Sequence, residues 1–336
     1  MDWTHQSPGA PTTMTPAGFL VEFNKRLCSG PCVLATVMHC TGSTPRAPGA
    51  QMACGEDWLL GTVGGGAAES KVINAARKAM GSGRPTEITI DLRGTPESIK
   101  DGICGGTMLV RLDPLDQAST TNLTQASHDL AAGHAIKQHF PPDDCWYLKP
   151  LDVVATGDHD ERWIVSPDPM LLIVGGGHCG VALAHAAAPL GFQIILQDER
   201  PEMAPESELP DGTIRSCGSI DQTLDSLAWH GPLYVALVTR SYQHDVQAIE
   251  HLATKPLAYA GLMGSRRRLT QVMKMLREHN VPETLIDFLD APIGIDLPTE
   301  TPEEIAISIC ARLIQARHAN CTKMAPVDPE AAVALG

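Results

Sequence analysis

Residues 171–180, Leu-Leu-Ile-Val-Gly-Gly-Gly-His-Cys-Gly, constrain the fold of this chain more than any other stretch. Four apolar residues lead directly into a Gly-x-Gly-x-x-Gly turn, and an alanine-rich helical run follows at 181–190. Residues 192–196 then have the pattern of a second strand, and Asp198 follows at the spacing expected for the acidic residue of a dinucleotide-binding unit, about 20 residues on. The order strand, turn, helix, strand therefore predicts parallel strands joined by a helix.

Each glycine of this turn has a physical role in such a unit. Gly175 permits the tight turn, Gly177 lets the backbone approach a pyrophosphate, and Gly180 lets the helix pack on its strand. The helix N-terminus offers N–H groups and a partial positive charge to an anion. Asp198 is expected to accept hydrogen bonds from a ribose diol. The alternative is a tight turn of the same fold that binds nothing.

The rest of this half of the chain repeats the same alternation of strands and helices. Further strands are expected at 213–217, 233–239, 257–263 and 293–296, and helices at 245–253, 266–278 and 302–318. Thr301 is the expected N-cap of the last helix, and Glu304 completes its capping box. Such alternation requires a parallel sheet that is covered on both faces.

The first part of the chain predicts an α+β module, in which hairpin strands pack against one helix. Helices are expected at 16–27 and 67–80, and strands at 33–40, 50–54, 58–63, 86–92 and 108–113. A further helix is expected at 123–140, and short strands at 151–165. The fold class is thus α/β, with a C-terminal Rossmann-like doubly wound parallel sheet and an N-terminal α+β module.

We expect five segments along the chain. They are a disordered tail at 1–15, the α+β domain at 16–115, a linker with peripheral elements at 116–170, the Rossmann-like domain at 171–318 and a tail at 319–336.

Composition narrows the function classes. The net charge of −14 argues against a nucleic-acid partner, because a phosphate backbone would be repelled. No apolar run is long enough to cross a bilayer, and residues 1–16 have no signal-peptide pattern, so we expect a cytoplasmic protein with no membrane partner. The ten cysteines include no Cys-x-x-Cys pair, and no residues show metal-ligand spacing, so no metal site is expected.

Six motifs occur in a fixed order along residues 16–316. They are residues 42–50, residues 61–66 with Glu69, residues 104–106, residues 175–180, residues 259–267, and residues 292–297 with 301–306. Together they resemble the XdhC/CoxI family, the accessory proteins of xanthine dehydrogenase and CO dehydrogenase. The resemblance implies a cofactor chaperone rather than a catalyst, which binds the molybdenum cofactor (molybdopterin), supports its sulfuration and delivers it to the apo-enzyme. It implies an apo molybdenum hydroxylase and a cysteine desulfurase as partners, and we expect a homodimer.

The molybdenum cofactor is anionic, so a protein that carries it needs N–H groups and arginine side chains. Gly64, Gly65 and Gly66 open a helix and offer an N–H nest, and Glu69 belongs to the same motif. Arg46 lies in a stiff loop between two prolines, where it is available to a phosphate. The alternative for Gly64, Gly65 and Gly66 is a plain strand-to-helix turn, and the alternative for Arg46 is a surface ion pair.

Ser265 and Arg266 begin a second helix, in the other module, and add fork-shaped donors for a phosphate. The alternative for Arg266 is a solvated first turn. We expect the cofactor to bind where the two modules meet.

Cys104 precedes two glycines and is our candidate thiolate for sulfur chemistry, although most isolated cysteines are buried and inert. The sequence departs from the family pattern at two positions. Ala67 stands where a cysteine commonly follows the three glycines, and Arg240 stands where a histidine is expected, with His244 nearby.

A second hypothesis is an NAD-dependent oxidoreductase of unknown substrate, which rests on the glycine turn and on Asp198. An acid at this position favours NAD over NADP. Against this hypothesis, no Tyr-x-x-x-Lys or clear His–Asp couple supplies a proton donor. A third hypothesis is that the turn is vestigial and the second module serves only as a docking scaffold.

Overall fold

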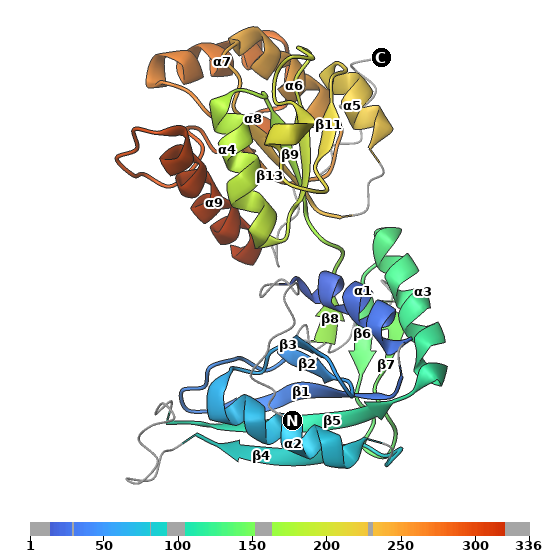
Figure 1. Cartoon of the computed structure of the whole chain (residues 1–336). Coiled ribbons are helices and arrows are strands. Elements are labelled where there is room, and N and C mark those ends of the chain that lie inside the picture. The colour runs from blue at the N-terminus through green and yellow to red at the C-terminus, as the bar shows by residue number, and fades with distance from the viewer. Residues whose placement is uncertain are drawn as a thin grey trace. The chain divides into compact units, whose positions relative to one another are not determined.

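The computed structural model describes residues 14–28, 30–80, 82–92, 105–151, 163–227 and 231–319, and it divides into two compact units, Met1–Pro167 and Asp168–Gly336 (Figure 1).

The described part of the N-terminal unit contains a five-stranded antiparallel sheet in the order β3-β2-β1-β5-β4. Its strands are β1 (Cys32–Thr41), β2 (Gln51–Cys54), β3 (Leu59–Gly61), β4 (Thr86–Asp91) and β5 (Thr107–Leu115). Alternate residues of β1 face opposite sides of the sheet, as the strand period of two requires. Val33 and Ala35 pack with Val72 of helix α2 (Gly66–Ala79), which lies along this face in Figure 1.

The other face of this sheet packs against helices α1 (Pro16–Leu27) and α3 (Thr120–Ala131). A short 3-10 helix, η2 (Gln117–Ser119), precedes α3. Leu34 of β1 shares this core with Phe23 of α1 and Leu123 of α3. Leu148 and Val165 join it from a small antiparallel sheet in the order β7-β6-β8, whose strands are β6 (Ile136–His139), β7 (Tyr147–Pro150) and β8 (Ile164–Val165).

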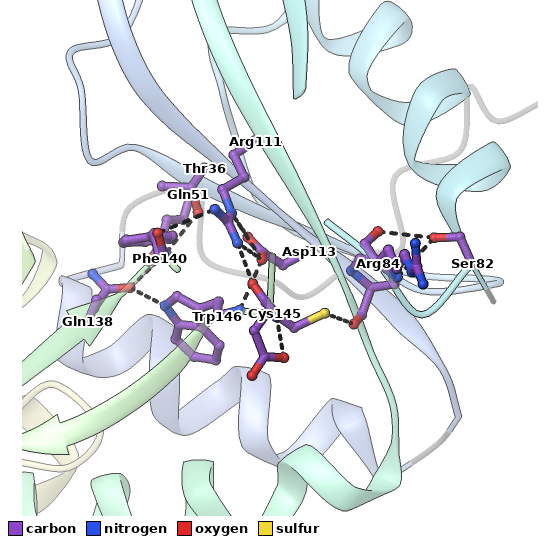
Figure 2. A network of polar contacts seen from close by, with 12 residues as sticks. Thr36, Gln51, Ser82, Arg84, Arg111, Asp113, Gln138, Phe140, Cys145 and Trp146 are labelled. Atoms are coloured by element: carbon purple, nitrogen blue, oxygen red, sulfur yellow. Dashed lines mark hydrogen bonds and ion pairs between the residues drawn. The ribbon is translucent and has the colours of Figure 1, made fainter. Parts of the chain in front are cut away.

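A buried polar network joins the end of β5 to the segment between β6 and β7 (Figure 2). Arg111 and Asp113 form an ion pair with 3.0 Å between Nη2 and Oδ1, and both side chains are almost fully buried. Arg111 also donates to the carbonyl oxygen of Asp144 at 2.6 Å, and the backbone N–H of Trp146 donates to Asp113 at 2.9 Å. Because each charged group has hydrogen-bond partners, the pair can be buried without leaving an unpaired charge.

The C-terminal unit contains a parallel sheet in the order β11-β10-β9-β12-β13 across its described residues. The strands are β9 (Met170–Val174), β10 (Gln193–Gln197), β11 (Ile214–Ser216), β12 (Leu233–Leu237) and β13 (Leu257–Leu262). Counted from β9, this is the order 3-2-1-4-5 of dinucleotide-binding sheets. All five residues of β9 are buried, as in a strand covered on both faces.

Helices cover both faces of this sheet. They are α4 (His178–Ala187), α5 (Ile220–Ser226), α6 (Tyr242–Leu252), α7 (Arg266–Glu278), α8 (Glu283–Phe288) and α9 (Pro302–Ala319), with short 3-10 helices η4 (Ala188–Leu190) and η5 (Glu206–Glu208). Leu171 packs with Leu183 of α4 and Leu313 of α9, whereas Leu172 packs on the opposite face with Val246 and Val272. The expected fold class is therefore confirmed, with a doubly wound sheet and an α+β unit.

Two expected elements were wrong. The helix predicted at 123–140 ends at Ala131, because Gly133 takes a left-handed φ of 88° and the alternating residues 136–139 form β6. The strand predicted at 293–296 does not form. Asp290, just before this range, makes an isolated bridge to Gly261, and the backbone turns at Gly294 with a φ of 98°.

The predicted capping box of α9 is confirmed. The hydroxyl of Thr301 accepts a hydrogen bond from the N–H of Glu304 at 3.2 Å, and the Glu304 carboxylate accepts the N–H of Thr301 at 3.2 Å.

Candidate functional site

The glycine turn after β9 has the geometry that its sequence predicts. Gly175 has a φ of 114°, which favours glycine, and its N–H donates to the carbonyl of Gln197 at 2.8 Å. A Cβ atom at Gly180 would lie 1.9 Å from the carbonyl oxygen of Gly175, so this position must stay small for α4 to pack on β9.

Gly177 has different surroundings. No atom outside the neighbouring residues lies within 4 Å of a Cβ placed there, so this side of the turn is open. Gly177 is the N-cap of α4, which has no side-chain cap and no acidic residue in its first turn. The first N–H groups of α4 are therefore available to an anion.

The turn lies where the strand order reverses, between β9 and β12. A Cβ at Gly175 would lie 3.0 Å from the carbonyl oxygen of Val238 and 3.1 Å from the nitrogen of Thr239, just after β12. Ligands of open α/β sheets bind at this switch point, beyond the carboxyl ends of the strands. The fold thus brings the glycine turn to the position where a nucleotide is bound in such sheets.

Asp198 follows β10 and is 8% exposed, with its carboxylate surrounded by donors. The N–H of Gly176 donates to Oδ2 at 2.7 Å, and Arg200 donates from its side chain to both oxygens, at 2.9 and 2.7 Å. Burial would raise the pKa of Asp198, but the hydrogen bonds from Arg200 and Gly176 lower it below its ordinary value. The carboxylate is therefore ionised at neutral pH and bound to its own chain.

A second polar cluster lies at the ends of β12 and β13. Asp245, at the start of α6, is fully buried and accepts hydrogen bonds from the Thr239 hydroxyl at 2.7 Å and from the guanidinium of Arg268. The hydroxyl of Ser265 caps α7 by accepting the N–H of Arg268 at 3.4 Å. Arg266 lies in the exposed first turn of α7, which contains no acidic residue. Because a basic first turn opposes the helix dipole, an anion near Arg266 would stabilise this end of α7.

Three glycine-containing motifs meet in the N-terminal unit. A Cβ at Gly42 would lie 3.0 Å from the carbonyl oxygen of Gly105, and one at Gly64 would lie 2.4 Å from the Cγ of Pro45. The loop that carries Arg46 therefore contacts both the turn before α2 and the Gly105–Gly106 pair. Arg46 is exposed on this loop. Cys104, the candidate thiolate, lies outside the described residues.

The turn at Gly64, Gly65 and Gly66 already has acceptors for part of its N–H groups. The Glu69 carboxylate accepts the N–H of Gly65 at 3.1 Å and the hydroxyl of Thr62 at 2.5 Å. The N–H of Gly64 donates to the Thr62 hydroxyl at 3.1 Å. A phosphate at Gly65 would have to displace the side chain of Glu69, whereas Gly66 faces open space with a φ of 60°.

Both parts of the chain match family models. Residues 171–313 match the XdhC Rossmann domain, and residues 29–91 match the XdhC and CoxI family. The two matches together span more than half of the chain, in the order of the motifs. This chain belongs to the XdhC and CoxI family.

Similar proteins occur in several bacteria. The uncharacterized protein YqeB of Escherichia coli strain K12 is 27% identical over 289 residues, which are 86% of this chain but 44% of YqeB, so the chain spans less than half of that relative. A probable xanthine dehydrogenase subunit of Bacillus subtilis strain 168 is 26% identical over 314 residues, 85% of this chain and 93% of that protein. A crystal structure of a xanthine dehydrogenase from Bacillus halodurans is 26% identical with a TM-score of 0.74, covering 89% of this chain and 96% of that one.

Sequence reasoning did not identify two residues of this XdhC-family chain that lie in or beside the glycine turn and the helix start after it. Arg200 pairs with Asp198, and the only signal was its position two residues after the acid. Cys179, in the first turn of α4, is half-buried, and burial raises the pKa of its thiol although Arg240 nearby opposes this. The Cys179 thiol is therefore protonated at neutral pH.

The described residues include no group of three metal-ligating side chains. None of the helices among them is long and apolar enough to cross a membrane.

Proposed function

We propose that this XdhC-family chain is an accessory factor that matures a molybdenum hydroxylase of the xanthine or CO dehydrogenase type. It binds the molybdenum cofactor as cargo, aids its sulfuration and inserts it into the apo-enzyme. The observation that carries the proposal is the presence of both family regions in one chain. Similarity to two proteins named for xanthine dehydrogenase, over most of their lengths, supports it.

The chemistry of the cargo fits donors that each unit has. The cofactor carries a phosphate, which is recognised by N–H groups and by guanidinium forks. In the C-terminal unit, the first turn of α4 faces open space at Gly177. In the N-terminal unit, Arg46 is exposed on a loop held by two glycine motifs. We propose that Arg46 binds the phosphate of the cargo, and that the first turn of α4 binds the phosphates of a nucleotide.

The same proposal names the partners. The chain docks an apo molybdenum hydroxylase and a cysteine desulfurase, acts as a homodimer and works in the cytoplasm. It is a cofactor chaperone rather than a catalyst, because its task is to bind and hand over the cofactor.

Retention of pterin tests the binding of cargo. The chain is incubated with molybdopterin and purified, and the pterin is released by denaturation, oxidised and measured by fluorescence. We expect the wild type to retain pterin and Arg46→Ala to retain less. Arg84→Ala changes another exposed arginine of the same unit and should behave like the wild type. Retention no greater than that of an unrelated protein would refute cargo binding.

Sulfuration is tested on the client enzyme. In cells that lack this chain, we expect the hydroxylase to contain less cyanide-labile sulfur per molybdenum, and re-expression of the wild type should restore the ratio. If Cys104 carries sulfur, Cys104→Ser should restore molybdenum but not the sulfur. An unchanged sulfur content in the absence of the chain would refute a role in sulfuration.

The alternative of an NAD-dependent oxidoreductase is favoured less. It rests on the glycine turn and on Asp198, and the carboxylate of Asp198 is engaged by Gly176 and Arg200.

A further inference from the structure

The carboxylate of Asp198 has no position left for another donor. Its Oδ2 accepts the N–H of Gly176 and an Nη2–H of Arg200, both at 2.7 Å. Its Oδ1 accepts the backbone N–H of Arg200 at 3.1 Å and the Nε–H of the same residue at 2.9 Å. An ionised carboxylate has about four lone-pair positions, so these four donors saturate it.

This saturation conflicts with the recognition of NAD. In sheets of this type, the acid after the second strand accepts hydrogen bonds from the ribose diol of NAD. For Asp198 to do so, the diol would have to displace a bidentate guanidinium, and charge-assisted bonds of this kind are stronger than those of a neutral hydroxyl. The residues at this position therefore do not fit NAD.

Arg200 presents its remaining donors at the same place. A guanidinium has five N–H groups, and Asp198 takes one on Nε and one on Nη2. The other three have no partner among the described residues, and the side chain is 57% exposed. They form the outer edge of a planar fork, which matches the geometry of a phosphate.

The loop that carries Arg200 is held in place from β11. Arg215 lies beside Leu196 of β10 and donates to the carbonyl oxygens of Pro201 and Met203, the latter at 3.2 Å. The N–H of Met203 donates to the carbonyl of Arg200 at 3.0 Å, which closes a turn. The guanidinium of Arg200 is therefore positioned at the end of β10 by both its ion pair and its backbone.

We propose that the C-terminal unit binds an adenine nucleotide whose ribose carries a 2′-phosphate, as in NADP, and that Arg200 is the residue that selects it over NAD. The pyrophosphate is bound by the first turn of α4 at Gly177, and the 2′-phosphate by the free N–H groups of Arg200. Asp198 acts as a positioning residue that orients the fork. This inference goes beyond the proposed function and does not depend on it.

Direct binding to the full chain tests the proposal. Isothermal titration calorimetry at low salt compares NADP⁺ with NAD⁺, and 2′,5′-ADP with 5′-AMP and with 3′,5′-ADP. We expect NADP⁺ to bind about tenfold or more tightly than NAD⁺, because a hydrogen bond to a charged group contributes at least that factor. The affinity for 2′,5′-ADP should exceed the affinities for 5′-AMP and for 3′,5′-ADP by a similar factor.

Variants assign the selectivity to Arg200. Arg200→Ala should lower the ratio of the affinity for NADP⁺ to the affinity for NAD⁺ to about one or below. The substitution removes the guanidinium fork and frees Asp198 for the ribose diol of NAD⁺. Arg277→Ala removes another exposed arginine of an ion pair, on α7, and should leave the ratio unchanged. Glu199→Gln, beside Asp198, should also leave it unchanged. Thermal melting checks that each variant is folded, and if Arg200→Ala does not fold, the comparison of 2′,5′-ADP with 5′-AMP on the wild type still decides.

Several results would overturn the proposal. They are tighter binding of NAD⁺ than of NADP⁺, preference for the 3′-phosphate isomer, no binding of NADP⁺ at millimolar concentration, or an unchanged ratio in folded Arg200→Ala. Failure here is distinct from failure of the maturation role, because pterin retention and sulfur content are measured separately and involve no NADP⁺.

Discussion

Gly177 and Gly180 lie in one turn, but their surroundings differ. A Cβ at Gly180 would collide with the carbonyl of Gly175 at 1.9 Å, whereas one at Gly177 would meet nothing within 4 Å. We therefore expect Gly180→Ala to destabilise the C-terminal unit by about 1–3 kcal/mol, the usual cost of overpacking. Gly177→Ala should cost less than about 1 kcal/mol, as at an N-cap, but should weaken nucleotide binding. Urea denaturation followed by circular dichroism measures the change in stability, and calorimetry measures the change in nucleotide binding. Equal destabilisation by the two substitutions would contradict this account.

The Asp198–Arg200 pair makes stability depend on pH. The folded-state pKa of Asp198 is lowered, because the donors around the carboxylate outweigh the effect of burial. Its contribution to stability is thus fully present above the unfolded pKa of about 3.9 and is lost as the pH falls through the lower folded value. We expect the difference in urea midpoint between wild type and Asp198→Asn to be large at pH 7 and to shrink below pH 4. A difference that is constant down to pH 3 would show that Asp198 does not act through its charge.

At the scale of elements, α6 and α7 are joined to the end of β12 by one buried carboxylate. Asp245 is fully buried and bonds Thr239 and Arg268, while the Arg268 side chain is 20% exposed. Burial raises the pKa of Asp245 although Arg268 and Thr239 oppose this. We expect Asp245→Asn to lower the free energy of unfolding by about 3 kcal/mol, because it leaves the charge of Arg268 without a carboxylate partner. Urea denaturation measures the change.

A double variant distinguishes the loss of the Asp245–Arg268 ion pair from the cost of leaving one charge unpaired. Asp245→Asn combined with Arg268→Met removes both charges and should recover part of the lost stability. Glu283→Gln breaks an exposed ion pair with Arg277, on α7, and is the matched control, which should change stability far less. If the double variant is as unstable as the sum of its single variants, the loss does not arise from an unpaired charge.

Local signals predicted most elements well. The bounds of α1 and α7 agree with the sequence prediction, and each start has a local signal, because Pro16 is the first residue of α1 and Ser265 is the N-cap of α7. Short strands were expected at 151–165, and β8 lies within this range, but β7 ends just before it and residues 152–162 lie outside the described residues. Both strands pair with β6, which the sequence pattern assigned to a helix. Helices α5 and α8 were not predicted either, because they are short and lie between stronger patterns.

The candidate site could be predicted only in part. The glycine turn follows from local sequence, because the spacing of its glycines sets the backbone. The pairing of Asp198 with Arg200 does not, because it depends on how the loop after β10 is anchored by Arg215 from β11. Glu69 illustrates the same limit, since its carboxylate bonds the turn that was expected to hold an anion. The prediction that the cofactor binds where the two modules meet stays a prediction.

At the scale of the whole molecule, each unit has its own core. The clusters around Phe23 and Val72 contain residues of the N-terminal unit only, and those around Leu171 and Leu172 contain residues of the C-terminal unit only. Since stability comes mainly from buried apolar contacts, each unit can unfold with its own cooperativity. We therefore expect two transitions in differential scanning calorimetry of the full chain.

Substitutions in each unit assign these transitions. Arg111→Met breaks the buried ion pair with Asp113 and should lower the midpoint temperature of the transition of the N-terminal unit only. Asp245→Asn should lower only the midpoint temperature of the transition of the C-terminal unit. NADP⁺ should raise the midpoint of that same transition, because a ligand stabilises the state that binds it. The isolated C-terminal unit should melt at the temperature of the transition that Asp245→Asn shifts. A single transition that both substitutions lower would mean that the two cores unfold as one, and the ligand would then stabilise the N-terminal unit as well.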